Sequence, residues 1–351
     1  MRYSETVWSL WNAGAFCGEG KDAKPYDSGM TALLEIRSLT VELPTAAGWV
    51  KPVNDLSLQI AAGQTLGLVG ESGSGKTMLA LALMGLLPPG ARVHGETRLV
   101  TKEGTAKSLT TLDEEGWRKV RGQQIAMIFQ EPMTSLNPVM RIGAQIEEAI
   151  LAHQPNLERG AVQLRLRTAM KHASMPEPET RARQFPHQLS GGLRQRAMIA
   201  MALAPSPELL IADEPTTALD VTVQKQILDL LDRLRRELDL ALLFITHDLG
   251  VVAKVADRVA VMYAGRIVEE GPVQKVLLSP QHPYTQGLLA ASPTLERRVL
   301  TPIPGTVPQL KQLPPGCAFA PRCSFRRAEC DQAVPAFRQV EPDHGARCVL
   351  P

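Results

Sequence analysis

The sequence lacks long apolar runs, has little cysteine and carries almost no net charge. Its 38 Lys and Arg residues are balanced by 36 Asp and Glu residues, which leaves a formal charge of +2. This balance argues against a strongly basic nucleic-acid-binding protein and against an acidic tail protein, so we expect no nucleic-acid partner. No uninterrupted apolar stretch approaches the roughly 18 residues of a membrane span, so we expect no transmembrane helix.

The N-terminal residues also lack the continuous apolar core of a secretory signal peptide. Residues 1–29 contain a third of the aromatic residues, without clear periodicity. We interpret them as an N-terminal extension, poorly ordered, that precedes a folded unit starting at Met30. A short amphipathic docking segment is the alternative interpretation.

Cysteine is too scarce for a disulfide scaffold, with five residues in the chain. Four of them lie within the last 35 residues: Cys317, Cys323, Cys330 and Cys348. In a chain without a signal peptide, such clustering favours a metal site over disulfide bridges. Ligand sets made only of thiolates suit zinc or an iron–sulfur centre, although the close cysteine pairs usual for zinc are absent. Cys17 lies outside this group, and we regard it as incidental.

The hydrophobic pattern predicts an α/β fold. Apolar residues alternate between 34 and 60, which is typical of half-buried antiparallel strands. Continuous apolar stretches predict buried strands of a parallel sheet at 66–69, 125–129, 209–212 and 240–245. Helical patterns separate these stretches, at 77–87 and 223–238 among others. Between about 131 and 189 the sequence predicts a helical insertion, with its best helices at 143–152 and 159–173.

The strongest motif is the segment GESGSGKT at residues 70–77, a complete G-x-x-x-x-G-K-T between an expected strand and an expected helix. Glycines allow the backbone to wrap around phosphates, and the amides of such a loop donate to phosphate oxygens. In this motif Lys76 reaches the β- and γ-phosphates, and Thr77 offers its hydroxyl to Mg²⁺. The predicted nucleotide-binding residues of this loop are Gly70, Ser72, Gly73, Ser74, Gly75, Lys76 and Thr77.

A second motif ends the apolar strand expected at 209–212. Asp213 follows this strand, where it can hold Mg²⁺ beside the phosphate loop, as in other P-loop ATPases. Glu214 comes next and is placed to polarise the attacking water. We therefore predict ATP hydrolysis with Glu214 as the general base.

These motifs stand in the order of the ATP-binding-cassette (ABC) ATPases, which the chain resembles from about residue 33 to 350. Residues 189–195, LSGGLRQ, resemble the family signature, with Leu193 where many members carry Gln or Met. The resemblance implies catalytic roles for Gln130, which also binds Mg²⁺, and for the switch residue His247. It implies that Ser190, Gly191, Gly192 and the D-loop residue Asp220 contact ATP, and that Trp49 stacks on adenine. The signature would contact ATP held by the phosphate loop of a second cassette.

Three further segments resemble the D-type ATPase of bacterial dipeptide and oligopeptide importers: residues 129–138, 213–222 and 279–285. This resemblance implies an F-type ATPase partner, two transmembrane permease chains and an external substrate-binding protein. It places the chain at the cytoplasmic face of the membrane, with the helical insertion receiving the permease. We interpret the His-Pro-Tyr-Thr element at 282–285 as a structural, proline-constrained turn.

The same resemblance implies a [4Fe–4S] cluster on the four C-terminal cysteines, with zinc as the alternative. The C-terminal tail has few large apolar residues, so a metal centre would stabilise it. We expect the ATP site to bind nucleotide when the tail is loosened. We also expect His282 and His344 to be solvated rather than to act as ligands.

The expected architecture is thus a P-loop ABC ATPase core with an antiparallel β subdomain, a helical insertion and a small Cys-rich lobe. The expected domains are an extension at 1–29, an ATPase domain at 30–280 and a peptide-importer-type extension at 281–351. Two other functions compete with peptide import. A cassette acting in DNA repair or translation would usually carry two cassettes or a coiled coil, and a redox enzyme would carry a flavin or nicotinamide motif. Nickel or glutathione import would fit the same motifs.

Overall fold

The computed structural model describes residues 32–46, 48–131, 135–217, 219–292 and 301–350. The N-terminal extension expected at residues 1–29, together with Cys17, lies outside the described residues. The chain divides into two compact units. Unit 1 comprises Met1–Ile60, Thr65–Arg98 and Phe244–Pro351, and unit 2 comprises Ala61–Gln64 and Leu99–Leu243.

A smaller sheet contains the strands expected between residues 34 and 60. In unit 1 its order is β2 (Gly48–Ala61), β1 (Ala32–Thr45) and β4 (Arg92–Val100). Strand β4 continues into unit 2, where β5 (Ala106–Ser108) pairs with it. The alternating pattern therefore gives two long strands with a buried and an exposed face, as predicted.

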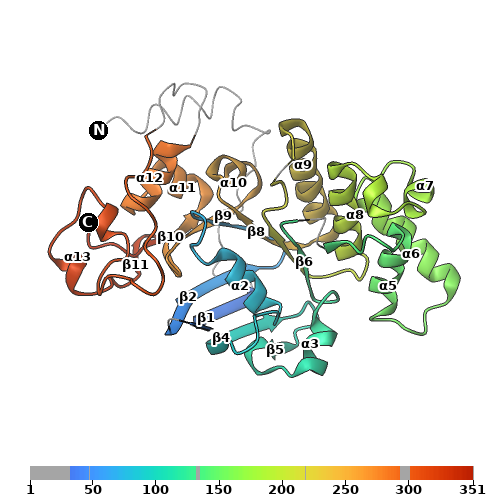
Figure 1. Ribbon diagram of the computed structural model, residues 1–351, viewed down its shortest axis with the longest axis horizontal. Helices are drawn as coiled ribbons and strands as arrows, with labels where there is room; N and C mark the ends of the chain where they lie inside the picture. Colours follow the sequence, from blue (N-terminus) through green and yellow to red (C-terminus); the bar gives the residue numbers. More distant parts are fainter. Residues whose placement is uncertain (1–31, 47, 132–134, 218, 293–300, 351) are drawn as a thin grey trace. The chain divides into compact units, whose positions relative to one another are not determined.

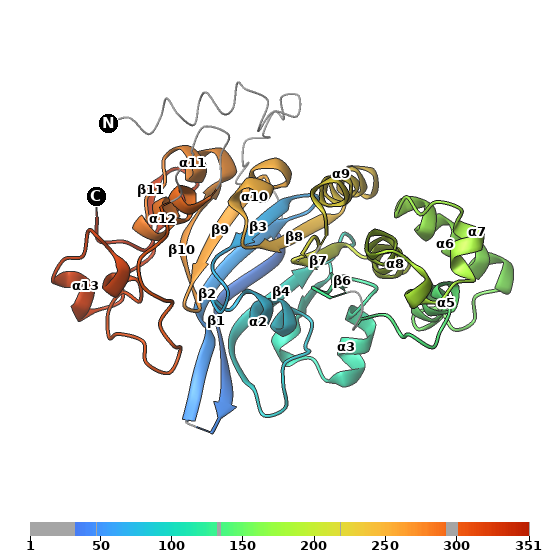
Figure 2. The same cartoon turned by 45° about the horizontal axis from the view of Figure 1, so that its top comes forward.

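The larger sheet has two parts that share one strand. In unit 1 its order is β11 (Arg338–Glu341), β12 (His344–Ala346), β10 (Arg266–Pro272), β9 (Arg258–Tyr263) and β3 (Thr65–Val69). Strand β8 (Ala241–Thr246) follows β3 and crosses the unit boundary, and in unit 2 it is followed by β7 (Leu209–Asp213) and β6 (Ile125–Ile128). The neighbours β9, β3 and β10 are visible in Figure 2.

The strand directions follow the burial pattern. Strand β3 runs parallel to β9, and β6 runs parallel to β7, while β10 is antiparallel to both β9 and β12. Every residue of β3, β6, β7 and β8 is buried. This agrees with the continuous apolar stretches that predicted these four strands, because strands of a parallel sheet are buried on both faces.

Several helices of unit 1 contact its strands. The helices of this unit are α2 (Lys76–Leu83), α10 (Leu249–Val255), α11 (Val273–Leu278), α12 (Pro283–Ala291) and α13 (Glu329–Gln332), with a 3-10 turn at Ala320–Arg322. Helix α2 is shorter than expected because Gly85 adopts φ 60 and two backbone bonds close the helix, from Gly85 to Ala82 and from Leu86 to Leu81.

The His-Pro-Tyr-Thr element is a helix start rather than the turn that we expected. His282 caps α12 by accepting a hydrogen bond from the Tyr284 amide at 3.0 Å, and Pro283 is the first helical residue. Proline suits this position because its missing N–H would have no partner there. The interpretation as a turn was wrong because proline is favoured both in turns and at the first position of a helix, so its presence does not distinguish them.

Unit 2 holds the helical insertion. Its helices are α3 (Glu114–Val120), α5 (Ile142–Leu151), α6 (Arg159–His172), α7 (Pro178–Ala182), α8 (Gly191–Leu203) and α9 (Val221–Leu238), with 3-10 turns at Leu109–Thr111 and Pro186–Gln188. Helices α5, α6 and α7 gather into one group (Figure 1). Among the described residues, no helix is long and apolar enough to cross a membrane.

Candidate functional site

The phosphate loop joins β3 to α2 in unit 1, as its motif predicts. Two of its glycines are required by close backbone approach. Gly75 has φ 108, and a Cβ atom there would collide with the carbonyl oxygen of Pro52. A Cβ atom on Gly70 would collide with the carbonyl oxygen of Met262. The glycine spacing therefore fits the loop against its own unit.

Lys76 is buried, with 6% of its surface exposed. Its Nζ donates hydrogen bonds to the carbonyl oxygens of Gly70 at 2.8 Å and Glu71 at 3.0 Å, which closes the loop on itself. Ser74 is also buried, whereas Ser72, Gly73 and Thr77 are exposed. The exposed residues include the threonine hydroxyl that the motif assigns to Mg²⁺.

Glu71, between these residues, is contacted by two side chains that the sequence did not single out for the site. Its amide donates to the Tyr284 hydroxyl at 2.8 Å, and its carboxylate accepts two bonds from the Arg322 guanidinium, at 2.7 and 3.0 Å. Arg322 also donates to the Tyr263 hydroxyl at 3.3 Å. Burial raises the pKa of Tyr284, and the hydrogen bond with Glu71 raises that of Arg322, so both remain protonated at neutral pH.

In unit 2, three residues meet at the end of β7. Asp213 ends the strand and is buried. The carboxylate of the next residue, Glu214, accepts a hydrogen bond from the side-chain Nε2 of Gln130 at 3.2 Å and another from the Thr217 hydroxyl at 2.8 Å. Glu214 itself has φ 45, a backbone conformation uncommon for residues other than glycine. The structure thus brings Gln130 and Glu214 together, two residues that lie 84 positions apart.

The signature segment also lies in unit 2, where it begins α8. Ser190 caps the helix by accepting from the Leu193 amide at 3.4 Å. Ser190 and Gly191 are exposed, so the first turn of α8 presents them to solvent. Asp220 caps α9 in the same way, with a 2.9 Å bond from the Val223 amide, while Ala218 of the D-loop lies outside the described residues.

The remaining predicted residues lie in unit 1. His247 is exposed between β8 and α10. Trp49 lies on β2 with 44% of its surface exposed, and the Arg92 guanidinium lies 4.0 Å from the centre of its ring. This cation–π contact was not predicted, because Arg92 belongs to a different strand.

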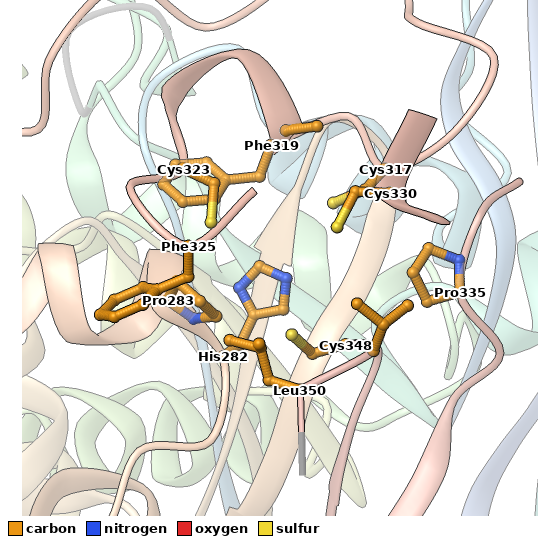
Figure 3. A pocket seen from close by; sticks show the side chains of 12 residues that line it. His282, Pro283, Cys317, Phe319, Cys323, Phe325, Cys330, Pro335, Cys348 and Leu350 are labelled. Carbon is orange, nitrogen blue, oxygen red and sulfur yellow. The ribbon is translucent and has the colours of Figure 1, made fainter. Parts of the chain in front are cut away.

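The four C-terminal cysteines line one cavity with His282 and Phe319 (Figure 3). Their sulfur atoms point into the cavity around the His282 ring. The Cys317 amide donates to the Cys330 carbonyl at 2.7 Å, which joins two of the chain segments that carry them. Burial raises the pKa of Cys317, Cys323 and Cys348, so these thiols are protonated at neutral pH when no cation is bound. Across the described residues, no group of three or more His, Cys, Asp or Glu side chains is arranged to hold a single metal ion.

The two histidines expected to be solvated are both buried, so that expectation was wrong. Both lie beside Glu269, a fully buried carboxylate on β10 that requires donors. It accepts hydrogen bonds from the Gln281 and His282 amides at 2.8 and 2.9 Å, and it pairs with His344 Nε2 at 2.8 Å. Burial lowers the pKa of His282 to about 4, so this ring is neutral at neutral pH.

Comparison with known proteins identifies the family. The family described as ABC transporter matches residues 53–217, and the family described as oligopeptide/dipeptide transporter, C-terminal region, matches residues 268–330. The oligopeptide transport ATP-binding protein OppD of Bacillus subtilis is 49% identical over 315 residues, covering 88% of this chain and 86% of the relative. The dipeptide transport ATP-binding protein DppD of Lactococcus lactis is 48% identical, covering 91% of this chain and 90% of the relative.

Solved structures give the same fold. The dimeric post-hydrolysis state of the ATP-binding cassette MJ0796, bound to ADP and Pi, aligns with a TM-score of 0.60 at 26% identity. That alignment covers 68% of this chain and 98% of the cassette. The ABC cassette fold expected from the motifs is therefore confirmed. The chain belongs to the family of oligopeptide and dipeptide transport ATP-binding proteins of ABC transporters.

Proposed function

We propose that this chain is the ATP-hydrolysing subunit that powers import of dipeptides or oligopeptides through a membrane ABC permease. The observation that carries the proposal is the complete phosphate loop in a chain whose C-terminal region, at 268–330, matches that of oligopeptide/dipeptide transporters. Binding of ATP closes a pair of cassettes, and hydrolysis opens it, because the γ-phosphate contacts exist only in the closed state.

In unit 1, the phosphate loop binds the nucleotide. The amides of the loop and Lys76 neutralise phosphate charge, and the exposed Thr77 hydroxyl ligates Mg²⁺. Lys76 donates to the carbonyls of Gly70 and Glu71, and on nucleotide binding it would exchange these bonds for phosphate contacts. Trp49 stacks on adenine, which requires Arg92 to leave the ring face or to share the base. His247 contacts the γ-phosphate.

In unit 2, Asp213 and Gln130 bind Mg²⁺, and Glu214 polarises the attacking water. The hydrogen bond from Gln130 fixes the Glu214 carboxylate and couples the two residues. Because a general base must keep an ionised carboxylate oriented towards its water, bonds from an amide and a hydroxyl suit this role. Ser190, Gly191, Gly192 and Asp220 act on ATP held by a second cassette.

The relatives are oligopeptide and dipeptide transport ATP-binding proteins, which supports an assembly with membrane permeases and a substrate-binding protein. The second cassette is an F-type ATPase, and the heterodimer binds two permease chains at the cytoplasmic face of the membrane. An external binding protein delivers the peptide. The ATPase domain covers residues 30–280, and its helical insertion at about 131–189 contacts the permease. An N-terminal extension at 1–29 precedes this domain, and the peptide-importer-type extension at 281–351 follows it.

We further propose that Cys317, Cys323, Cys330 and Cys348 hold a [4Fe–4S] cluster. Four thiols around one cavity fit the donor set of such a cluster. A tetrahedral zinc ion, with Zn–S bonds of about 2.3 Å, needs its sulfur atoms within about 4 Å of one another. Zinc on the same four thiols is the alternative to the cluster. The cluster would link four points of the chain.

Co-purification tests the transport function. The tagged chain is isolated with its bound proteins from the cells that naturally express it, reconstituted in vesicles and supplied with ATP and a labelled peptide. We expect the chain to co-purify with an F-type ATPase and two permeases and to drive peptide uptake that requires Lys76. Recovery with a DNA-repair or translation complex instead would overturn the proposal.

A further inference from the structure

The C-terminal segment, residues 301–350, contacts the phosphate loop through one residue of its 3-10 turn. Arg322 has a side chain that is 4% exposed, and both terminal nitrogens of its guanidinium donate to the Glu71 carboxylate, at 2.7 and 3.0 Å. Two parallel charge-assisted bonds of this kind fix both partners in orientation. Glu71 is the second residue of the phosphate loop, and it lies 251 positions from Arg322.

A second contact holds the backbone of the same loop residue. The Glu71 amide donates to the hydroxyl of Tyr284 on α12, at 2.8 Å. Tyr284 is fully buried, with its ring 4.5 Å from that of Tyr263 and 5.4 Å from that of Phe319. This amide is therefore directed to a rigid aromatic cluster, while the Glu71 carbonyl accepts from Lys76 at 3.0 Å.

The position of this carboxylate has an electrostatic consequence. A negative side chain in a loop that binds a polyphosphate opposes binding, unless its charge is neutralised or directed away. The Glu71 side chain is 29% exposed, so solvent screens it only in part. Arg322 supplies the opposite charge at hydrogen-bond distance.

We propose that Arg322 and Tyr284 are positioning residues for ATP binding. They hold Glu71 away from the phosphates and neutralise its charge, so that the C-terminal segment sets the nucleotide affinity of the phosphate loop. The inference rests on the proposed nucleotide-binding function of that loop. It adds that the segment after the ATPase domain takes part in ATP binding.

Arg322 also connects the loop to the cysteine cavity. It immediately precedes Cys323, and its Nε donates to the Pro304 carbonyl at 2.8 Å. Phe319, three residues earlier, lines the cavity and packs edge-on against Tyr263. Any change that displaces this turn therefore displaces the guanidinium that neutralises Glu71.

The test is a double-mutant cycle on the full-length chain, purified anaerobically, with Mg²⁺–ADP binding measured by calorimetry. We expect Arg322→Met to raise the dissociation constant for Mg²⁺–ADP about tenfold. Without Arg322 the Glu71 carboxylate repels the phosphates, and partial exposure to solvent weakens this repulsion to that of an effective dielectric constant of about 20. Arg322→Met combined with Glu71→Gln should restore affinity to within about threefold of wild type. In the assembled transporter, Arg322→Met should raise KM for ATP and leave kcat within about twofold.

The matched control is Arg326→Met. Arg326 makes a similar paired contact with Asp331 in the same segment, and both side chains of this pair are exposed. Its loss should leave nucleotide affinity unchanged. If Arg326→Met weakens ADP binding as much as Arg322→Met does, the effect is general loosening and the proposal fails.

Two outcomes separate this inference from the proposed function. Failure of the wild-type chain to bind Mg²⁺–ADP would overturn both, whereas wild-type binding that is unchanged in Arg322→Met overturns the inference alone. Failure of Glu71→Gln to rescue Arg322→Met also overturns it. Should Arg322→Met not fold, as thermal unfolding would show, Arg322→Lys and Tyr284→Phe are measured instead. Each should weaken ADP binding about threefold, and wild-type affinity in both would refute the proposal.

Discussion

Two glycine-rich segments of this chain begin helices, and they differ in what surrounds them. The phosphate loop at 70–77 has a buried lysine and contacts with Tyr284 and Arg322, both far along the chain. The signature segment at 189–195 has an exposed serine and glycine and a cap made by its own Ser190. The phosphate loop is fixed by contacts with distant residues of its own unit, whereas the signature segment presents its serine and glycine to solvent.

This difference fits two roles for the same local chemistry. Helix N-termini attract anions in both segments. A loop that must keep its shape around a bound nucleotide gains from contacts with the rest of its unit. A segment that binds the nucleotide of a second cassette must instead be accessible. The comparison therefore leads to variants that separate nucleotide binding from turnover.

The largest effect is expected from a variant that leaves both segments intact. Glu214→Gln keeps the shape of the side chain and loses the carboxylate that we propose polarises water. ATP turnover in the assembled transporter should fall about 100- to 10,000-fold, while ATP binding is retained. Phosphate release and nucleotide binding measured on the same preparation check this. A wild-type rate would show that Glu214 is not the general base.

The next variants break the two segments one at a time. Lys76→Ala should weaken nucleotide binding by the isolated chain about 100-fold, because a buried charge partner of the phosphates is lost. Ser190→Arg should leave that binding unchanged, since Ser190 belongs to the segment offered to a second cassette. In the assembled transporter it should reduce turnover about 100-fold.

The isolated chain supplies the control for this pair. Dilute monomer should hydrolyse ATP poorly and should gain activity when the proposed F-type partner and permeases are added. Full activity in a strictly monomeric preparation would contradict the proposal that the signature segment acts on the nucleotide of a second cassette.

Local patterns explain why much of the core could be predicted from the sequence. The eight residues at 70–77 and the apolar run at 209–212 each specify their own turn or strand. Their order along the chain then identified the family. The predicted limits of helices such as 143–152 and 159–173 agree within a residue with α5 and α6, because their apolar faces repeat with helical periodicity.

Contacts between distant residues explain most of what could not be predicted. Arg322 and Glu71 lie 251 positions apart, and His344 and Glu269 lie 75 apart, and no local spacing marks either pair. The expectation that two histidines are solvated failed for this reason. Tyr284 belonged to a recognised segment, but its sequence does not show that its hydroxyl meets the phosphate loop.

A smaller effect is expected from the cysteines, and it refines our expectation that the ATP site still binds nucleotide when the tail is loosened. Anaerobic purification should give a brown protein with about four iron and four sulfide per chain. Cys323→Ser should remove that colour and, because Arg322 is its neighbour, should weaken Mg²⁺–ADP binding about three- to fivefold, less than Arg322→Met does. Iron content and calorimetry check this. A colourless wild-type protein with one zinc would exclude the cluster, and unchanged affinity in a bleached variant would limit the coupling to Arg322.

The smallest effect concerns Asp220, which the family resemblance assigns to ATP and the structure shows as the cap of α9. Its carboxylate accepts from the Val223 amide at 2.9 Å. Asp220→Ala should lower the free energy of unfolding by about 1 kcal/mol, because an orphan amide loses its acceptor. Asp220→Asn should keep this stability, since asparagine caps helices about as well as aspartate. Chemical denaturation of the isolated chain measures both.

If Asp220 also acts across the cassette pair, Asp220→Asn will lower turnover in the assembled transporter although its stability is normal. Wild-type turnover in Asp220→Asn, with reduced stability in Asp220→Ala, would show that this residue acts as a helix cap alone.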